Sequence, residues 1–222
     1  MKALLIGAGI EPAHSGLSPV YTDYSFRYIP ANYFDLKQRE TKEKISYKSL
    51  GLDYSVSDKI VNRKVHMDPE FETFTYGDQD KVRRNELLEL DRGDLLVFHL
   101  AGEWQGDPRD VCCHIFGYFV VNYVVDWNEL TLAERKKYQP ELRKNAHMRS
   151  SKSKDNLVLV KGYKKSKILK RCIPITDPNP KPGKNAFTIS DDMSRFFGIK
   201  EPIKLSVPVW IKDEKAIDDL MR

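Results

Sequence analysis

Two long apolar runs dominate the hydrophobic pattern of the chain. The first, residues 94 to 100, opens after a turn at Arg92 and Gly93, and the second, residues 114 to 125, is rich in β-branched and aromatic residues and is interrupted by Gly117. Such runs are typical of buried strands. The segment between them is polar and too short for a crossover helix, so we expect the two strands to be antiparallel neighbours.

Shorter patterns place further elements around these strands. We expect strands at residues 3 to 6, 26 to 29 and 157 to 161, and an edge strand at residues 207 to 211, because Pro208 has no N–H for a ladder. A helix is predicted after the capping box Thr131-Leu-Ala-Glu134, with Pro140 stopping or restarting it. Further helices are predicted near residues 83 to 90 (or an extended connector), after Ser166 as far as Leu169, from Ser190 to Gly198, and from residue 212 onward.

The irregular order of these elements predicts an α+β fold. The predicted strands are scattered among short helices and long loops. They do not alternate regularly with one helix after each strand, and this favours a mixed sheet. We expect one domain over residues 1–222, with a strongly curved mixed sheet or a small barrel and short peripheral helices.

The composition is that of a protein with its own core. The chain has 222 residues, 41% of them hydrophobic, and no window approaches the about 18 apolar residues that a membrane span needs. Its three cysteines fit neither a disulfide framework nor a zinc motif. The cytoplasm is therefore the expected compartment.

Positive charge is concentrated in one tract of this mildly basic chain. The net charge is +5, and residues 143 to 171 contain only Asp155 as a counter-charge. The tract predicts either a phosphate-binding surface or an ordinary solvated face. Trp104, between the two core strands, either stacks on a base or covers the sheet edge. The basic candidates for nucleic-acid binding are Arg149, Lys152, Lys154, Lys161, Lys164, Lys165 and Lys167.

The candidate chemistry centres on His66-Met-Asp-Pro-Glu70. In an extended segment residues 66, 68 and 70 point to one face, so an imidazole and two carboxylates would line one wall of a pocket. Such a group suits proton transfer or a divalent cation. The alternative is that Asp-Pro starts a turn and that an acid there only caps the next helix.

Three further histidines fall into two kinds of surroundings. His147 lies beside Asn145 and near Arg149, an arrangement that suits recognition of a phosphate or carboxylate, or a simple helix-end cap. His99 and His114 lie at the ends of the two core strands, where packed structural histidines are expected.

Familiar nucleotide and nucleophile motifs are missing from the sequence. It contains no G-x-S-x-G, P-loop or H-E-x-x-H pattern. Gly7-x-Gly9 follows a predicted strand, but no third glycine comes at Pro12 and no helix begins there, which excludes a dinucleotide-binding fingerprint.

Five short segments carry a resemblance to a known family. In chain order they are Gly9 to Pro19, Asp23 to Pro30, His66 to Phe71, Gly93-Asp-Leu-Leu-Val-Phe98 and His114 to Val121. Together they resemble the third family of nucleotide-modification-associated domains, which implies a setting in nucleic-acid base modification without defining a reaction. The last two segments also look like the core of PUA-like barrels, which hold modified bases or RNA.

The residues and the resemblance lead to two hypotheses. The first is a base-modification enzyme or accessory protein that acts on a nucleotide or on nucleic acid. The second is a non-catalytic PUA-like reader of RNA, DNA or a modified base, which uses the basic tract and stacking by Trp104 or Tyr76. The enzyme requires His66 and at least two acids around one pocket. Its candidate catalytic residues are Glu11, Asp23, His66, Asp68, Glu70 and His147.

Overall fold

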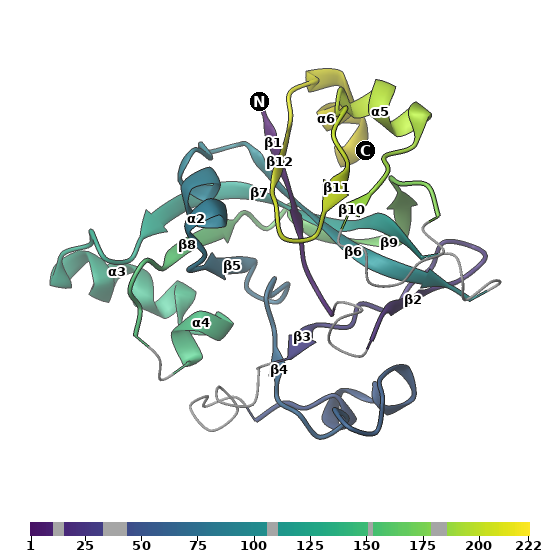
Figure 1. Ribbon diagram of the computed structural model, residues 1–222. Helices are drawn as coiled ribbons and strands as arrows, with labels where there is room; N and C mark the ends of the chain where they lie inside the picture. Colours follow the sequence, from purple (N-terminus) through teal and green to yellow (C-terminus); the bar gives the residue numbers. More distant parts are fainter. Residues whose placement is uncertain (11–15, 33–43, 106–110, 151–152, 179–185) are drawn as a thin grey trace.

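The computed structural model describes residues 1–10, 16–32, 44–105, 111–150, 153–178 and 186–222. Its centre is an eight-stranded mixed sheet with the order β12-β1-β6-β7-β8-β5, in which β2 also pairs with β6 and β9 with β7 (Figure 1). The strands are β1 (Ala3–Gly7), β2 (Ser18–Val20), β5 (Thr75–Asp78), β6 (Leu95–Trp104), β7 (Val111–Asp126), β8 (Val158–Gly162), β9 (Lys167–Pro174) and β12 (Val209–Ile211).

The two long apolar runs form the middle of this sheet. They correspond to β6 and β7, which pair antiparallel over most of their length, as predicted. Strand β6 also pairs in parallel with β1, which makes the sheet mixed and confirms the α+β class. The sheet is neither closed nor strongly curled, so the predicted curvature and small barrel are not confirmed.

Alternate side chains of the central strands pack on opposite faces of the sheet. Val97 belongs to a core cluster with side chains of α5 (Asp191–Phe197) and α6 (Glu214–Met221), whereas Phe98 packs in a second cluster with α2 (Lys81–Leu88). Figure 1 shows α5 and α6 together at one end of the molecule. Both faces are therefore covered, as the continuous apolar character of the runs indicates.

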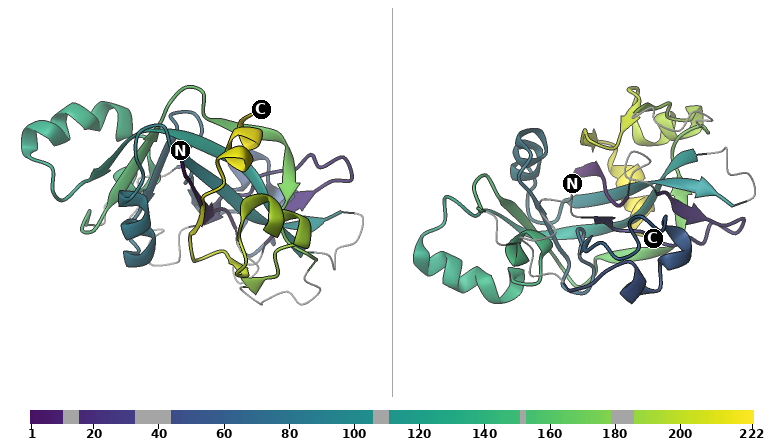
Figure 2. Two further views of the ribbon diagram at one scale, coloured as in Figure 1. Left: turned by 90° about the horizontal axis from the view of Figure 1, so that it is seen from above. Right: turned by 60° about the horizontal axis from the view of Figure 1, so that its bottom comes forward.

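Smaller elements surround the sheet. Helix α3 (Leu132–Leu142) begins at the predicted capping box and projects away from the sheet (Figure 2), and it continues through Pro140. No helix in the described ranges is long and apolar enough to cross a membrane. The remaining elements are β3 (Ala31–Asn32), η2 (Lys48–Leu50), η3 (Asp53–Ser55), β4 (Val65–His66), α4 (Ala146–Arg149), β10 (Ala186–Phe187) and β11 (Ile203–Lys204).

Three local predictions are wrong: Pro140 neither stops nor restarts α3, and in the other two cases long-range packing decides. The helix expected after Ser166 is instead strand β9, because the Ser166 hydroxyl accepts the Val120 N–H (3.0 Å) and the following residues pair with β7. Residues 26 to 29 form one bridge, from Phe26, and no strand. Tyr28 in that segment stacks on Phe116 with ring centroids 4.7 Å apart, so side-chain packing replaces a ladder.

Candidate functional site

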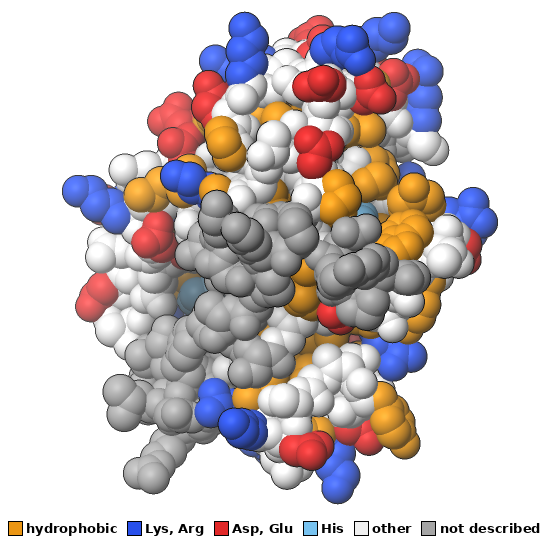
Figure 3. Space-filling view, turned by 45° about the vertical axis from the view of Figure 1, so that its right-hand side comes forward, with side chains coloured by type: hydrophobic (Ala, Val, Ile, Leu, Met, Phe, Trp, Pro, Cys, Tyr) orange, Lys and Arg blue, Asp and Glu red, His pale blue; other side chains and the backbone are white. Residues whose placement is uncertain are grey.

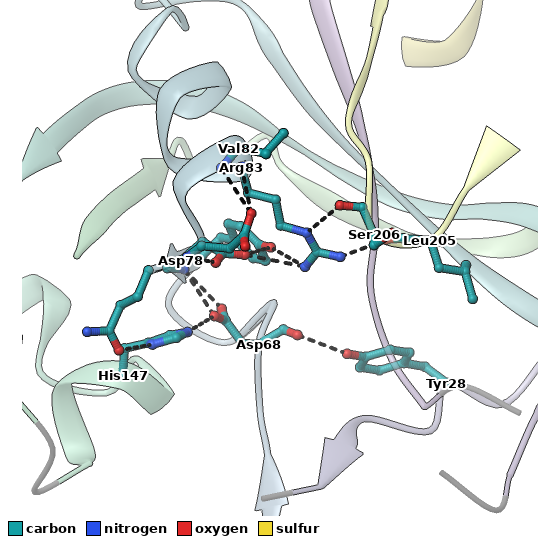
Figure 4. A network of polar contacts seen from close by, with 12 residues as sticks. Tyr28, Asp68, Asp78, Val82, Arg83, His147, Leu205 and Ser206 are labelled. Carbon is teal, nitrogen blue, oxygen red and sulfur yellow. Dashed lines mark hydrogen bonds and ion pairs between the residues drawn. The ribbon is translucent and has the colours of Figure 1, made fainter. Parts of the chain in front are cut away.

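His66, Asp68 and His147 meet at one point although α4 lies about eighty residues after β4. One nitrogen or oxygen atom from each lies within 4.8 Å of the others. The two imidazole rings meet edge to face, with centroids 4.7 Å apart. Figure 4 shows His147 pointing toward the Asp68 carboxylate. This set of donors could transfer a proton or hold a divalent cation.

The Asp68 carboxylate is buried and held by several donors. The Gly77 N–H donates to both carboxylate oxygens (3.2 and 3.1 Å), and the Asn145 side-chain amide donates to Oδ1 (3.1 Å). His147 Nε2 lies 3.2 Å from Oδ2, and the Asp68 side chain is 3% exposed. Burial raises the pKa of Asp68 to about 8, although the charge of His66 and the hydrogen bond from Gly77 oppose this.

Gln79 orients the His147 ring through Nδ1, the ring nitrogen that does not face Asp68. Its Nδ1 lies 3.4 Å from Gln79 Oε1, while the Gln79 amide nitrogen donates to the Ser153 and Asp155 carbonyls (3.1 and 2.8 Å). The His147 backbone N–H donates to Asn145 Oδ1 (2.9 Å), which caps α4. Asn145 therefore positions the helix that carries His147 as well as the Asp68 carboxylate.

Gly77 permits the close approach on which this site depends. It pairs with Leu159 where β5 joins β8. A Cβ atom at this position would lie 3.0 Å from Asn145 Oδ1, 3.0 Å from Leu159 Cδ2 and 3.1 Å from His147 Cδ2. Any larger residue must displace one of these neighbours.

Of the other predicted acids, none that the structure describes joins His66 and Asp68. Glu70 accepts hydrogen bonds from the Glu72 and Thr73 N–H groups (2.6 and 2.9 Å) and from the Thr73 hydroxyl, so it caps its own turn. Asp23 is exposed, and hydrogen bonds from the side chain and backbone of Ser25 lower its pKa. Glu11 lies outside the described residues. Asp68 is thus the one described acid of the predicted set in the cluster, so the expected two acids beside His66 are not found among the described residues, and His147 is the third member of the group instead.

The basic tract divides into lysines that bind other parts of the chain and lysines that are exposed to solvent. Lys154 donates to the His147 carbonyl (2.6 Å) and Lys161 to the Thr73 carbonyl, while Lys167 lies over the Tyr118 ring at 5.6 Å. Arg149 is half-buried at the end of α4, and Lys152 lies outside the described residues. On the face in Figure 3, the described lysine and arginine side chains lie around the rim and form no single patch.

Lys164 and Lys165 are exposed in the turn between β8 and β9 and line a surface cleft of about 570 Å³. We call it the basic cleft; Arg92, Gly93 and Tyr163 complete its lining. The Arg92 guanidinium lies over the Tyr163 ring, 5.4 Å from its centroid, and its Nε donates to the Tyr163 hydroxyl. The cleft is lined by three cationic side chains and no acidic one among the described residues.

The aromatic candidates are less accessible than the sequence suggests. Tyr76 is 3% exposed, and its hydroxyl donates to Asp78 Oδ2 (3.0 Å), so its ring is not open for stacking. Trp104 ends β6, half-buried, and packs edge-on against Tyr24 with centroids 5.3 Å apart. In the described part of the chain Trp104 therefore covers a neighbour at the sheet edge.

Sequence reasoning misses two of the residues that build the site and only partly finds a third. The sequence indicates Asn145 as an amide partner for His147, but its bond to Asp68 spans 77 positions and leaves no local signal. Neither Gln79 nor Gly77 is among the predicted residues. Gly77 sits in a Tyr-Gly-Asp run inside a short strand, and a glycine there often marks a close approach, which is the signal that could have found it.

Comparison with known proteins gave one match. A family model described as nucleotide modification associated domain 3 matches residues 2–199, which confirms the resemblance drawn from the five short segments. No curated protein and no solved structure matched the chain.

Proposed function

Because the chain belongs to the nucleotide modification associated domain 3 family, we propose that it modifies a nucleotide or a base in nucleic acid, with His66, Asp68 and His147 as the reactive centre. The observation that carries this is the Asp68 carboxylate, 3% exposed, with two imidazoles beside it. Burying a carboxylate is costly unless it is held by donors, and such groups cluster at functional sites.

The layout of the centre suggests which groups meet the substrate. The His147 side chain is 18% exposed and His66 is half-buried, whereas Asp68 lies behind them. A base would therefore contact the imidazoles first. Asp68 would act through them by orienting a ring, sharing a proton or helping to hold a cation.

The basic cleft is the proposed binding site for phosphate. Leu159 of β8 pairs with Gly77 at the reactive centre, and Tyr163 of the cleft follows the end of the same strand. Four residues of strand span about 13 Å at about 3.3 Å per residue. An oligonucleotide bridges that distance more readily than a mononucleotide does, so a base within nucleic acid is the favoured substrate.

The proposal treats residues 1–222 as one domain in the cytoplasm. Strand β8 runs past the reactive centre and ends at the basic cleft, so one sheet carries both. Cys113 and Cys172 are buried and form no disulfide, which suits a reducing compartment.

A second candidate function is a reader without catalysis, as in PUA-like proteins. The basic cleft favours it, because Arg92 stacked on Tyr163 beside two exposed lysines could bind a phosphate backbone with no reaction. The central sheet is open and does not close into a barrel, so the fold does not add support to this alternative.

The test uses cells, which supply any co-substrate the reaction needs. DNA, RNA and the free nucleotide pool from cells that express the wild-type protein, Asp68→Asn or Lys164→Glu/Lys165→Glu would be converted to nucleosides and compared by mass spectrometry. We expect a nucleoside whose amount changes with the wild type and not with Asp68→Asn, with a smaller change for the double variant. Glu70→Gln, which alters only the neighbouring turn, serves as the control.

Identical nucleoside profiles for the wild type and Asp68→Asn would overturn the catalytic proposal. If the purified Asp68→Asn protein then still binds oligonucleotides as tightly as the wild type, the reader is supported. If neither protein binds oligonucleotides, both functions are excluded.

A further inference from the structure

We propose that His66, Asp68 and His147 bind one divalent transition-metal ion, so that the reactive centre is a metal centre. The proposal deepens the proposed function, and its use in a reaction rests on that function. Two imidazoles and one carboxylate are the donors that Zn²⁺, Fe²⁺, Mn²⁺ and Co²⁺ accept in sites that keep positions open for substrate. Their donor atoms already lie within 4.8 Å of one another.

The tautomer of His147 suits a metal ligand. The amide nitrogen of Gln79 donates to the Ser153 and Asp155 carbonyls, which leaves Gln79 Oε1 facing His147 Nδ1 at 3.4 Å. An amide oxygen only accepts, so a neutral His147 ring that forms this hydrogen bond carries its proton on Nδ1. The lone pair of Nε2 then points toward Asp68. Metal-binding histidines are oriented in the same way, with the second N–H donated to an oxygen.

The distance between the two nearest donor atoms also fits a metal ion. His147 Nε2 and Asp68 Oδ2 are 3.2 Å apart. Two ligands at about 2.1 Å from a metal lie about 3.0 Å apart at an octahedral angle and about 3.4 Å apart at a tetrahedral one. A lone pair and a carboxylate oxygen repel at this distance unless a proton or a cation lies between them. The separation of this pair therefore matches one edge of a coordination shell.

The carboxylate is held in place before any ion arrives. The Gly77 N–H and the Asn145 amide donate to Asp68, and Asn145 also accepts the His147 N–H. These bonds fix one ligand and the backbone of the other, as the outer shell of a metal site does. The His66 ring lies beside the pair, 4.7 Å from that of His147, and one of its nitrogens lies within 4.8 Å of the other two donor atoms, which makes it the third ligand of the proposed site.

The openness of the site indicates a catalytic and not a structural ion. Three protein ligands leave at least one coordination position open, and the His147 side chain is 18% exposed. A base or a water molecule could take that position. Structural zinc sites use four protein ligands and contain thiolates far more often.

The test is a titration of chelator-treated protein with Co²⁺, followed by visible absorption and by thermal unfolding. We expect one Co²⁺ per chain, a d–d absorption band and a raised unfolding temperature in the wild type. Asp68→Asn and His66→Ala should each lower the Co²⁺ affinity by about 100-fold or more. Glu70→Gln is the matched control, because this residue lies two positions from Asp68 and its carboxylate accepts hydrogen bonds from its own turn in the described structure, so the variant should keep the wild-type affinity.

The second variant, His66→Ala, keeps the test valid if Asp68→Asn fails to fold. His66 is half-buried, and its replacement leaves the hydrogen bonds that Gly77 and Asn145 donate to Asp68 in place. A wild-type protein that shows no d–d band at millimolar Co²⁺, or variants that bind as tightly as the wild type, would overturn the metal centre. A nucleoside change that needs Asp68 but survives chelation would leave the proposed function standing without the metal. Co²⁺ binding by a protein that leaves cellular nucleosides unchanged would support the metal centre and contradict the proposed function.

Discussion

The histidines that the structure describes have two opposite environments. His66 and His147 lie half-buried beside a carboxylate, on segments far apart in the chain, whereas His99 and His114 lie inside the central strands at 1% and 2% exposure. The sequence predicts a structural role for the second pair, and its burial agrees with this. The residue type is the same in both places. The neighbouring groups and the access to solvent decide which pair is able to take part in chemistry.

The buried pair is held neutral by its surroundings. Burial lowers the pKa of His99 to about 3, and the charge of Arg83 adds to the effect. Burial lowers the pKa of His114 to about 4, against a hydrogen bond with the Cys112 carbonyl (3.1 Å from Nδ1). Neither ring exchanges a proton near neutral pH, so neither is suited to acid–base work.

The largest expected effect is on stability in acid. A histidine whose folded pKa is lowered takes up its proton in the unfolded state first, so stability is full above the unfolded pKa of 6.5 and is lost as the pH falls toward about 3 for His99. Between pH 7 and 5 this costs about 2 kcal/mol per histidine. His99→Leu, which cannot titrate, should therefore lose about 2 kcal/mol less than the wild type over that range, as measured by urea unfolding at both pH values.

The comparison of variant with wild type isolates His99 from the other titrating groups, which both proteins share. His114→Leu should show a similar reduction, because its folded pKa of about 4 also lies well below pH 5. If the wild type and His99→Leu lose equal stability, His99 is not the buried neutral group described above.

An intermediate effect is expected from crowding one histidine of each kind. Gly77→Ala places a Cβ 3.1 Å from His147 Cδ2, and Gly102→Ala places one 2.9 Å from His114 Nδ1 and 2.6 Å from Val20 Cγ2. The first should lower Co²⁺ affinity by about 10- to 100-fold, as changes beside metal ligands do. The second should cost about 1–3 kcal/mol of unfolding free energy through overpacking and leave metal affinity unchanged.

Calorimetric Co²⁺ titration and urea unfolding of both variants check this contrast. A weaker metal affinity in Gly102→Ala as well would mean that the two environments are coupled through the sheet. Unchanged affinity in Gly77→Ala would mean that the site at His147 tolerates displacement and needs no close approach.

The smallest effect on stability is expected in the basic cleft. Lys164 and Lys165 are exposed, so replacing both with Glu should change the unfolding free energy by no more than about 0.5 kcal/mol. Oligonucleotide affinity should fall, and the log–log salt slope should flatten by about 0.7 to 0.9 for each phosphate that the variant no longer neutralises. Lys161→Gln is the informative partner, because Lys161 donates to the Thr73 carbonyl and should affect stability more than the salt slope.

Fluorescence anisotropy at several salt concentrations measures both variants. A salt slope that is the same in the wild type and in Lys164→Glu/Lys165→Glu would remove the cleft from nucleic-acid binding and leave it as a solvated face.

The sequence by itself determined the middle of the fold and the places where elements begin. The apolar runs of β6 and β7, the capping box of α3 and the serine and glycine that bound α5 all act through neighbours within a few positions. The chemistry of such signals is local, so they can be read in one dimension. The same holds for His66 and Asp68, which are two residues apart.

Only the tertiary structure decided which of the candidate residues meet. His147 reaches Asp68 because β5 pairs with β8 in a register that sets Gly77 against Leu159, and because Asn145 bonds to both partners. Glu70 shares the local spacing of Asp68 but is turned into its own loop by backbone donors. Spacing along the chain predicts which side chains could share a face, whereas the long-range register of the strands and the competition of backbone N–H groups for each carboxylate determine which ones do.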